Sequence, residues 1–234
     1  MAGPYIGQMK SVLVQQTPTS PIIELFSDLP ACDPRAAAYL LAAYIGDFPA
    51  DTVFLCVVDP GVGSARRPVV TRVDGQWFVG PDNGLFDIVA RHGHDVTWWE
   101  IVWRPDDRLA STFHGRDLFA PIAARLASGS LADGDLHTIQ KKYHTEWPDD
   151  YAHVIYIDHF GNAITGVRAS TLDKRARISV NNKTLAYANT FSDVAVQEAF
   201  WYENANGLVE IAVNQGRADE MMGIKLGDTV QWQE

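Results

Sequence analysis

The chain has 234 residues, of which 47% are hydrophobic, and this is enough apolar material for one large packed domain or two small ones. Its formal net charge of -10 at pH 7 disfavours a nucleic-acid backbone as partner, because proteins that bind phosphate backbones gather Lys and Arg on one face. The sequence shows neither a basic and apolar leader nor an apolar run of about 20 residues, so we expect a cytoplasmic protein that makes no use of a membrane.

Helical patterns alternate with strand patterns in the first half of the chain, which indicates a layered α/β fold. The clearest helix is predicted at residues 32–46. There, Asp33 can cap the helix, Pro34 suits its first position and Gly46 can end it. Further helical patterns cover residues 83–93 and 116–129.

Strand patterns lie between these helices. Residues 51–59 form an apolar run that predicts a buried strand. Residues 68–81 predict two strands joined at Asp74-Gly75, a dipeptide that strongly favours a tight hairpin. The two cysteines match no metal-binding spacing, so we expect free thiols in a reducing cytoplasm.

Around residues 141–151 the pattern changes to short alternating runs separated by Gly, Asn and Asp. These runs predict strands at residues 153–158, 176–181, 208–214 and 228–232. We therefore expect an α/β domain at residues 1–147 and a smaller all-β domain at residues 148–234.

One candidate for chemistry is the stretch VVDPGVGSARRP, residues 57–68. It places Asp59 at the carboxyl end of a predicted strand, which is where open α/β sheets bind ligands. Arg66 follows the glycine turn and can fold back to hold that carboxylate ionised. A tight turn explains the same residues without any function. A phosphate-binding loop is disfavoured, because the arginines lead into a strand and not into a helix.

A second candidate is His114 in the stretch STFHGRDLFAP, residues 111–121. The residue stands just before a predicted helix, whose amino terminus disfavours an imidazolium and so favours a neutral ring that can accept a proton. A capping or packed histidine is the alternative interpretation. The other histidines have no Asp, Glu or Cys spacing that completes a ligand set, so we predict no metal site.

Taken in order, the motifs VVDPGVGSARRP, PDNGLFD, STFHGRDLFAPIAARLASG, DHFGNAITG and LVEIAVNQG resemble those of the S-adenosyl-L-methionine (SAM) hydroxide adenosyltransferases, relatives of the fluorinase and chlorinase enzymes. The resemblance implies an amino-terminal Rossmann-like α/β domain and a smaller carboxyl-terminal β-barrel-like domain. It implies hydrolysis of SAM to adenosine and L-methionine, with SAM as substrate and no cofactor. The catalytic triad would be Asp59, Arg66 and His114.

The same resemblance implies a homotrimer, in which SAM binds between the large domain of one subunit and the small domain of its neighbour. The side chains that would contact the substrate are Phe113 and Phe160 around the nucleoside, Asp158 and Asn162 at the amino-acid end, and Asn206, Asn214 and Gln215 in the stretches that bind methionine and adenine. Ordinary turn and strand formation is the competing explanation for most of these positions.

Two other functions compete with hydrolysis. A SAM-dependent halogenase would need a halide where the water sits, and an ionised Asp59 would repel that halide; the halogenases of the family also lack the triad. A SAM- or adenosine-binding protein without turnover is the other alternative. It is favoured by the start of the chain, since relatives begin with a strand ending in a TDFG-like motif that is missing before PYIGQMK. We expect that the true start lies upstream.

Overall fold

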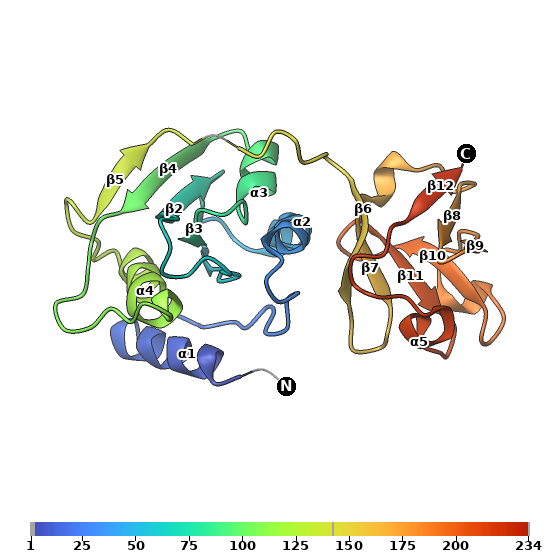
Figure 1. Ribbon diagram of the computed structural model, residues 1–234, viewed down its shortest axis with the longest axis horizontal. Helices are drawn as coiled ribbons and strands as arrows, with labels where there is room; N and C mark the ends of the chain where they lie inside the picture. Colours follow the sequence, from blue (N-terminus) through green and yellow to red (C-terminus); the bar gives the residue numbers. More distant parts are fainter. Residues whose placement is uncertain (1–2, 142, 234) are drawn as a thin grey trace. The chain divides into compact units, whose positions relative to one another are not determined.

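A computed structural model describes residues 3–141 and 143–233 of the chain (Figure 1). It divides into two compact units. The first contains Met1–Ala38 and Gly46–His144, and the second contains Tyr39–Ile45 and Thr145–Glu234. In the described part of the chain, no helix is long and apolar enough to cross a membrane.

The first unit is built on a five-stranded mixed sheet with the strand order β1-β3-β2-β4-β5. Its strands are β1 (Val53–Leu55), β2 (Pro68–Val73), β3 (Gln76–Pro81), β4 (Val96–Ile101) and β5 (Leu136–Ile139). Only β1 and β3 run parallel, and the other neighbours are antiparallel. The α/β class predicted for this half is therefore confirmed in its coarse form, with a sheet that is mixed.

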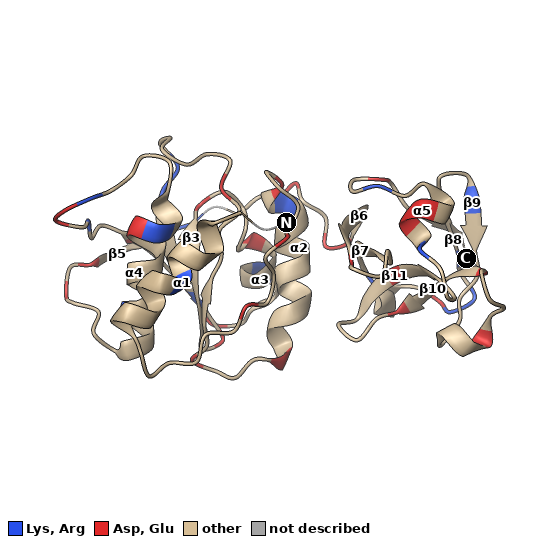
Figure 2. Ribbon diagram, turned by 90° about the horizontal axis from the view of Figure 1, so that it is seen from below, with Lys and Arg blue, Asp and Glu red and all other residues tan. Residues whose placement is uncertain are grey.

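Helices cover both faces of this sheet. They are α1 (Tyr5–Gln16), α2 (Pro34–Tyr44), α3 (Asp87–His92) and α4 (Ala120–Ser128). The paired helices α1 and α4 lie on one side of β3, and α3 and the start of α2 lie on the other (Figures 1 and 2). Side chains alternate along β3 to match: Val79 packs in the cluster that contains Phe119, whereas Phe78 stacks on Phe54 with ring centroids 5.0 Å apart.

Local sequence signals account for several of these elements. Asp33 caps α2 by accepting a hydrogen bond of 2.9 Å from the backbone N–H of Ala36. Asp74 and Gly75 have φ angles of 47° and 93°, which is the conformation that a two-residue hairpin requires. Both of these predictions are confirmed. Gly46 does not end α2 in a left-handed conformation, because the helix continues directly into the 3-10 turn Ile45–Asp47.

The strand predicted at residues 51–59 is shorter than expected. Regular pairing covers β1 only, although the N–H of Cys56 still donates to the carbonyl of Val79 at 3.0 Å. The chain then leaves the sheet, and Asp59 lies in the following turn. Both cysteines are free, and burial raises the pKa of Cys56 to about 12, so this half-buried residue is a thiol and not a thiolate.

Residues 145–233 of the second unit form two antiparallel sheets and the short helix α5 (Ala218–Met222). The strand order is β10-β11-β7-β6 in one sheet and β12-β8-β9 in the other. The strands are β6 (Tyr151–Ile157), β7 (Ala163–Arg168), β8 (Arg177–Val180), β9 (Lys183–Leu185), β10 (Ala199–Glu203), β11 (Leu208–Val213) and β12 (Gln231–Gln233). Each strand predicted for this half overlaps an observed one. Among residues 143–233 the two sheets do not close into a barrel.

The parallel pairing of β1 with β3 generates a stability prediction at Gly80. A Cβ at this position would lie 2.2 Å from the carbonyl oxygen of Cys56 and 2.9 Å from the ring of Phe86. Gly80→Ala should therefore lower the free energy of unfolding by about 3 kcal/mol, measured by urea denaturation. Gly7→Ala is the matched control, because a Cβ there meets nothing within 4 Å, and it should stabilise α1 by about 0.5–1 kcal/mol. Equal stability of the two variants would contradict this account of the sheet.

Candidate active site

Asp59, Arg66 and His114 meet in the first unit. The Nε of Arg66 donates to Oδ1 of Asp59 at 3.0 Å, and its Nη2 donates to Oδ2 of the same carboxylate. The same Nη2 lies 2.9 Å from Nδ1 of His114. Arg66 therefore bridges the other two side chains, one of which stands 48 positions further along the sequence.

The ion pair at the centre of this triad is almost fully buried. The side chains of Arg66 and Asp59 are 9% and 3% exposed. Both carboxylate oxygens receive a charge-assisted hydrogen bond in the paired geometry that an arginine fork favours. The guanidinium also lies 5.2 Å from the ring centroid of Phe119, which closes one of its faces. Because a buried charge without a partner is costly, removal of either side chain alone would strongly destabilise the fold.

The glycine-rich turn brings the two ends of the triad together. Gly63 has a φ of +79°, and a Cβ there would lie only 2.6 Å from the carbonyl oxygen of Ser111. Ser111 belongs to the segment that leads into His114, so the turn must touch this segment closely for the triad to form. A residue with a side chain cannot occupy this position without displacing that segment.

His114 directly precedes a π-helical turn, Gly115–Phe119, that leads into α4. Burial lowers the pKa of His114 below the ordinary 6.5, and the nearby charge of Arg66 lowers it further, while Asp59 opposes the shift. The lowered pKa agrees in direction with the predicted neutral imidazole. Its causes are burial and the charge of Arg66, whereas the prediction relied on the helix amino terminus. A guanidinium can only donate, so Nδ1 of His114 must be the acceptor and the ring hydrogen lies on Nε2.

The residues around His114 fix this turn against α1. Asp117 accepts a hydrogen bond of 2.8 Å from the backbone N–H of Ala110 and pairs with Arg116. Arg116 donates to the side chain of Gln8 at 3.0 Å and lies 5.0 Å from the ring centroid of Phe113. Phe113, predicted to pack around a nucleoside, is thus held as part of the scaffold next to the histidine.

The other predicted substrate residues lie in the second unit, where a hollow of about 730 Å³ opens between the loop after β6 and the end of β11. Asp158, Phe160, Asn162 and Gln215 line it. The structure places the two remaining asparagines elsewhere. The backbone N–H of Asn206 donates within the turn between β10 and β11, and the side chain of Asn214 donates to the carbonyl of Val194 at 2.9 Å.

Asp158 organises one wall of this hollow. Its carboxylate accepts hydrogen bonds from the backbone N–H groups of Phe160 and Asn162, at 2.9 Å and 2.8 Å, and one of 3.0 Å from the amide side chain of Asn162. The turn is therefore tight and acidic. Phe160 stands out of it with 71% of its surface exposed.

Two polar residues of the hollow, Glu210 and Tyr202, did not emerge from the sequence. Glu210 is 5% exposed and accepts hydrogen bonds from the Tyr202 hydroxyl and, at 3.0 Å, from the side chain of Asn204. Burial raises the pKa of Glu210, and the charge of Asp158 adds to this shift. Burial and Glu210 together raise the pKa of Tyr202. The available signal was a single carboxylate inside the apolar run LVEIAV, which is unusual unless the group has partners.

No group of three or more His, Cys, Asp or Glu residues is arranged to hold a metal ion in residues 3–141 and 143–233.

The chain matches a known protein family in both of its halves. Residues 1–134 match the family described as SAM hydroxide adenosyltransferase N-terminal domain, and residues 152–231 match its C-terminal domain. A relative named (R)-S-adenosyl-L-methionine hydrolase from Salinispora tropica is 36% identical over 99% of this chain and 93% of its own length. One of the same name from Thermus thermophilus is 35% identical over 97% of this chain and 94% of its own length.

Two solved structures have the same fold. An uncharacterized conserved protein from Thermotoga maritima superposes with a TM-score of 0.89 and 30% identity, over 100% of this chain and 97% of that one. A conserved hypothetical protein from Thermus thermophilus gives a TM-score of 0.76 and 33% identity, over 100% and 95% of the two chains.

The bridging position of Arg66 predicts how His114 titrates. In the wild-type protein the imidazole should titrate below 6.5 in an NMR pH titration. Arg66→Met removes the neighbouring cation and leaves the Asp59 carboxylate, so the pKa of His114 should rise. Arg66→Lys is the control that keeps the charge and should keep the pKa low. An Arg66→Met protein that is folded and has an unchanged His114 pKa would show that the two side chains do not interact.

Proposed function

Because the chain belongs to the SAM hydroxide adenosyltransferase family, we propose that it hydrolyses SAM to adenosine and L-methionine. The family match covers both units, and the relatives named as hydrolases align with nearly the whole chain. The observation that carries the proposal is the buried ion pair of Asp59 and Arg66, with His114 hydrogen-bonded to the same guanidinium, because these side chains supply the groups that such a reaction needs.

The reaction places few demands on acid catalysis. Water attacks the 5′ carbon of the ribose in line with the sulfur, a C–O bond forms, the C–S bond breaks, and its electron pair returns to sulfur. The sulfonium therefore leaves as a neutral thioether, and the only proton to be moved is one from the water. The enzyme must aim the water and accept this proton, for which positioning contributes about 7–11 kcal/mol and proton transfer about 10²–10⁴-fold in rate.

The geometry of the triad suggests how these tasks are divided. Nδ1 of His114 is occupied by Arg66, so the ring presents Nε2–H as a donor that can hold a water or ribose oxygen. The lone pairs that are still free belong to the Asp59 carboxylate. We assign proton acceptance to Asp59 and orientation of the water to His114, while Arg66 holds the carboxylate in place through two hydrogen bonds.

Substrate binding is assigned to the hollow of the second unit. Asp158 and Asn162 offer an acidic turn for the amino-acid end of SAM, and Phe160 offers an aromatic face for its nucleoside. Phe113 from the first unit and Gln215 complete the proposed set, from which Asn206 and Asn214 are left out because they do not line the hollow. Glu210 joins this set because its buried carboxyl faces the same hollow.

We further propose that the protein is a homotrimer in which one subunit supplies the triad and its neighbour supplies the hollow. The exposed ring of Phe160 at the rim supports this, since a large apolar surface beside a hollow is typical of a site that a ligand or a partner covers. Within this assembly the first unit would act as a Rossmann-like domain. The second would act as a barrel-like domain, for which the bridges His153–Thr229 and Tyr187–Trp201 between strand edges give support.

The proposed reaction predicts where the oxygen of water goes. Incubation with SAM in ¹⁸O-labelled water should give adenosine with the label on its 5′ oxygen and unlabelled L-methionine, detected by chromatography and mass spectrometry. Asp59→Asn and His114→Ala should each lower kcat by about 10²–10⁴-fold. If chloride or fluoride with SAM gave a 5′-halogenated adenosine in place of adenosine, the protein would be a halogenase; tight retention of unchanged SAM would identify a binding protein.

The division of roles within the triad predicts a difference between two substitutions of His114. His114→Gln retains an N–H donor and should keep at least about a tenth of the wild-type kcat, whereas His114→Ala should not. In the wild type, kcat should fall as the pH drops below the lowered His114 pKa, and this acid limb should be absent in His114→Gln. Equal losses in both variants would mean that His114 itself accepts the proton.

A further inference from the structure

The PDNG turn, residues 81–84, forms hydrogen bonds to both ends of the loop that carries Asp59 and Arg66. The side-chain amide of Asn83 donates to the carbonyl of Val58 at 2.8 Å, and the backbone N–H of Asp82 donates to the carbonyl of Arg67 at 2.9 Å. Val58 directly precedes Asp59, and Arg67 directly follows Arg66. This single turn therefore fixes the entry and the exit of the loop that carries the buried ion pair.

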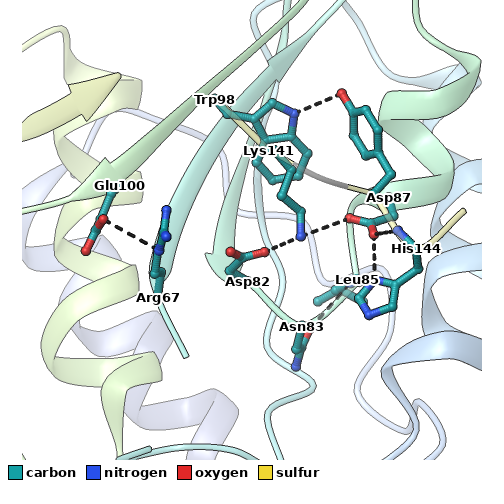
Figure 3. A network of polar contacts seen from close by, with 10 residues as sticks. Arg67, Asp82, Asn83, Leu85, Asp87, Trp98, Glu100, Lys141 and His144 are labelled. Carbon is teal, nitrogen blue, oxygen red and sulfur yellow. Dashed lines mark hydrogen bonds and ion pairs between the residues drawn. The ribbon is translucent and has the colours of Figure 1, made fainter. Parts of the chain in front are cut away.

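The PDNG turn is itself anchored by a network of charged side chains (Figure 3). The Lys141 ammonium bonds to the carboxylate of Asp82 and lies 3.5 Å from Oδ1 of Asp87. Oδ2 of Asp87 accepts hydrogen bonds from the backbone N–H of His144, at 2.9 Å, and from its Nδ1, at 2.7 Å. Lys141 also lies 5.6 Å from the ring centroid of Trp98.

The charged side chains of this network are buried, whereas the charged side chains of an ordinary surface turn are exposed to solvent. The side chain of Lys141 is 9% exposed and that of Asp87 is 1% exposed. Buried ion pairs often contribute little net stability compared with apolar residues of similar size, because removing the charges from water is costly. What such pairs do provide is a fixed orientation, since few arrangements satisfy all their donors and acceptors. Here the group held in orientation is the turn that carries Asn83.

We propose that Asn83 is a positioning residue for the triad, and that the Asp82–Lys141–Asp87 network holds it in place. Asn83 touches no reacting atom in this account. It acts by keeping Val58, and with it Asp59, at the distance from Arg66 at which the guanidinium reaches both the carboxylate and His114. The catalytic meaning of this role rests on the proposed function, although the positioning itself does not.

The first test is kinetic. Asn83→Ala should lower kcat for SAM by about 10–100-fold, as expected for a small displacement of catalytic groups, and leave KM within about twofold of wild type. Lys141→Met should also lower kcat. Lys141→Arg should keep most of the wild-type kcat, because it retains the charge and the donors. Lys10→Met is the matched control, since it removes an exposed lysine paired with Glu24, and it should not alter kcat.

The second test needs no turnover. In Asn83→Ala the pKa of His114, followed by NMR, should rise from its lowered value, because Arg66 is no longer held beside the ring. If this variant does not fold by circular dichroism, Asn83→Ser replaces it, because a hydroxyl retains a donor in a smaller side chain. If the wild-type protein does not hydrolyse SAM, but the pKa of His114 still rises in Asn83→Ala, the proposed function is wrong and the positioning role is supported. Wild-type kcat in Asn83→Ala, or a reduced kcat with an unchanged His114 pKa, would overturn the positioning role.

Discussion

The structure depends on one guanidinium. Arg66 lies between a buried carboxylate and a half-buried imidazole, and its fork of donors satisfies both. A lysine offers one compact charge and could not bridge two partners in the same plane. The close approach of Gly63 to Ser111, the parallel pairing of β1 with β3, and the π-helical turn after His114 all serve to bring these three groups to one place.

The charge of the assembled triad fits the proposed substrate. Asp59 and Arg66 cancel, and a neutral His114 adds nothing, so the group carries no net charge. A sulfonium can approach such a site without repulsion, whereas a protonated His114 would place a positive charge beside it. The burial and the cation that lower the His114 pKa therefore also keep the site compatible with a cationic substrate. The acidic turn at Asp158 is consistent with the same substrate class.

Sequence patterns predicted the local elements well because their causes are local. The cap at Asp33 and the hairpin at Asp74-Gly75 each depend on one or two residues. The mixed strand order was not predictable in this way. The alternating pattern of a strand indicates which of its side chains are buried, but not which strand lies next to it. Lys141 meets Asp82 across 59 positions, and Glu210 meets Tyr202 across two strands. The three triad residues were found as candidates, while the bridge through Arg66 emerged only in the fold.

The most direct test of this account is the position of the single hydrogen on the ring of His114. Long-range ¹H–¹⁵N correlation NMR at pH 8 distinguishes the two neutral tautomers and the imidazolium. The account predicts a bare Nδ1 facing Arg66 and a hydrogen on Nε2. A hydrogen on Nδ1, in either the other neutral tautomer or the cation, would mean that Arg66 does not donate to His114, and the bridge on which the site depends would not exist.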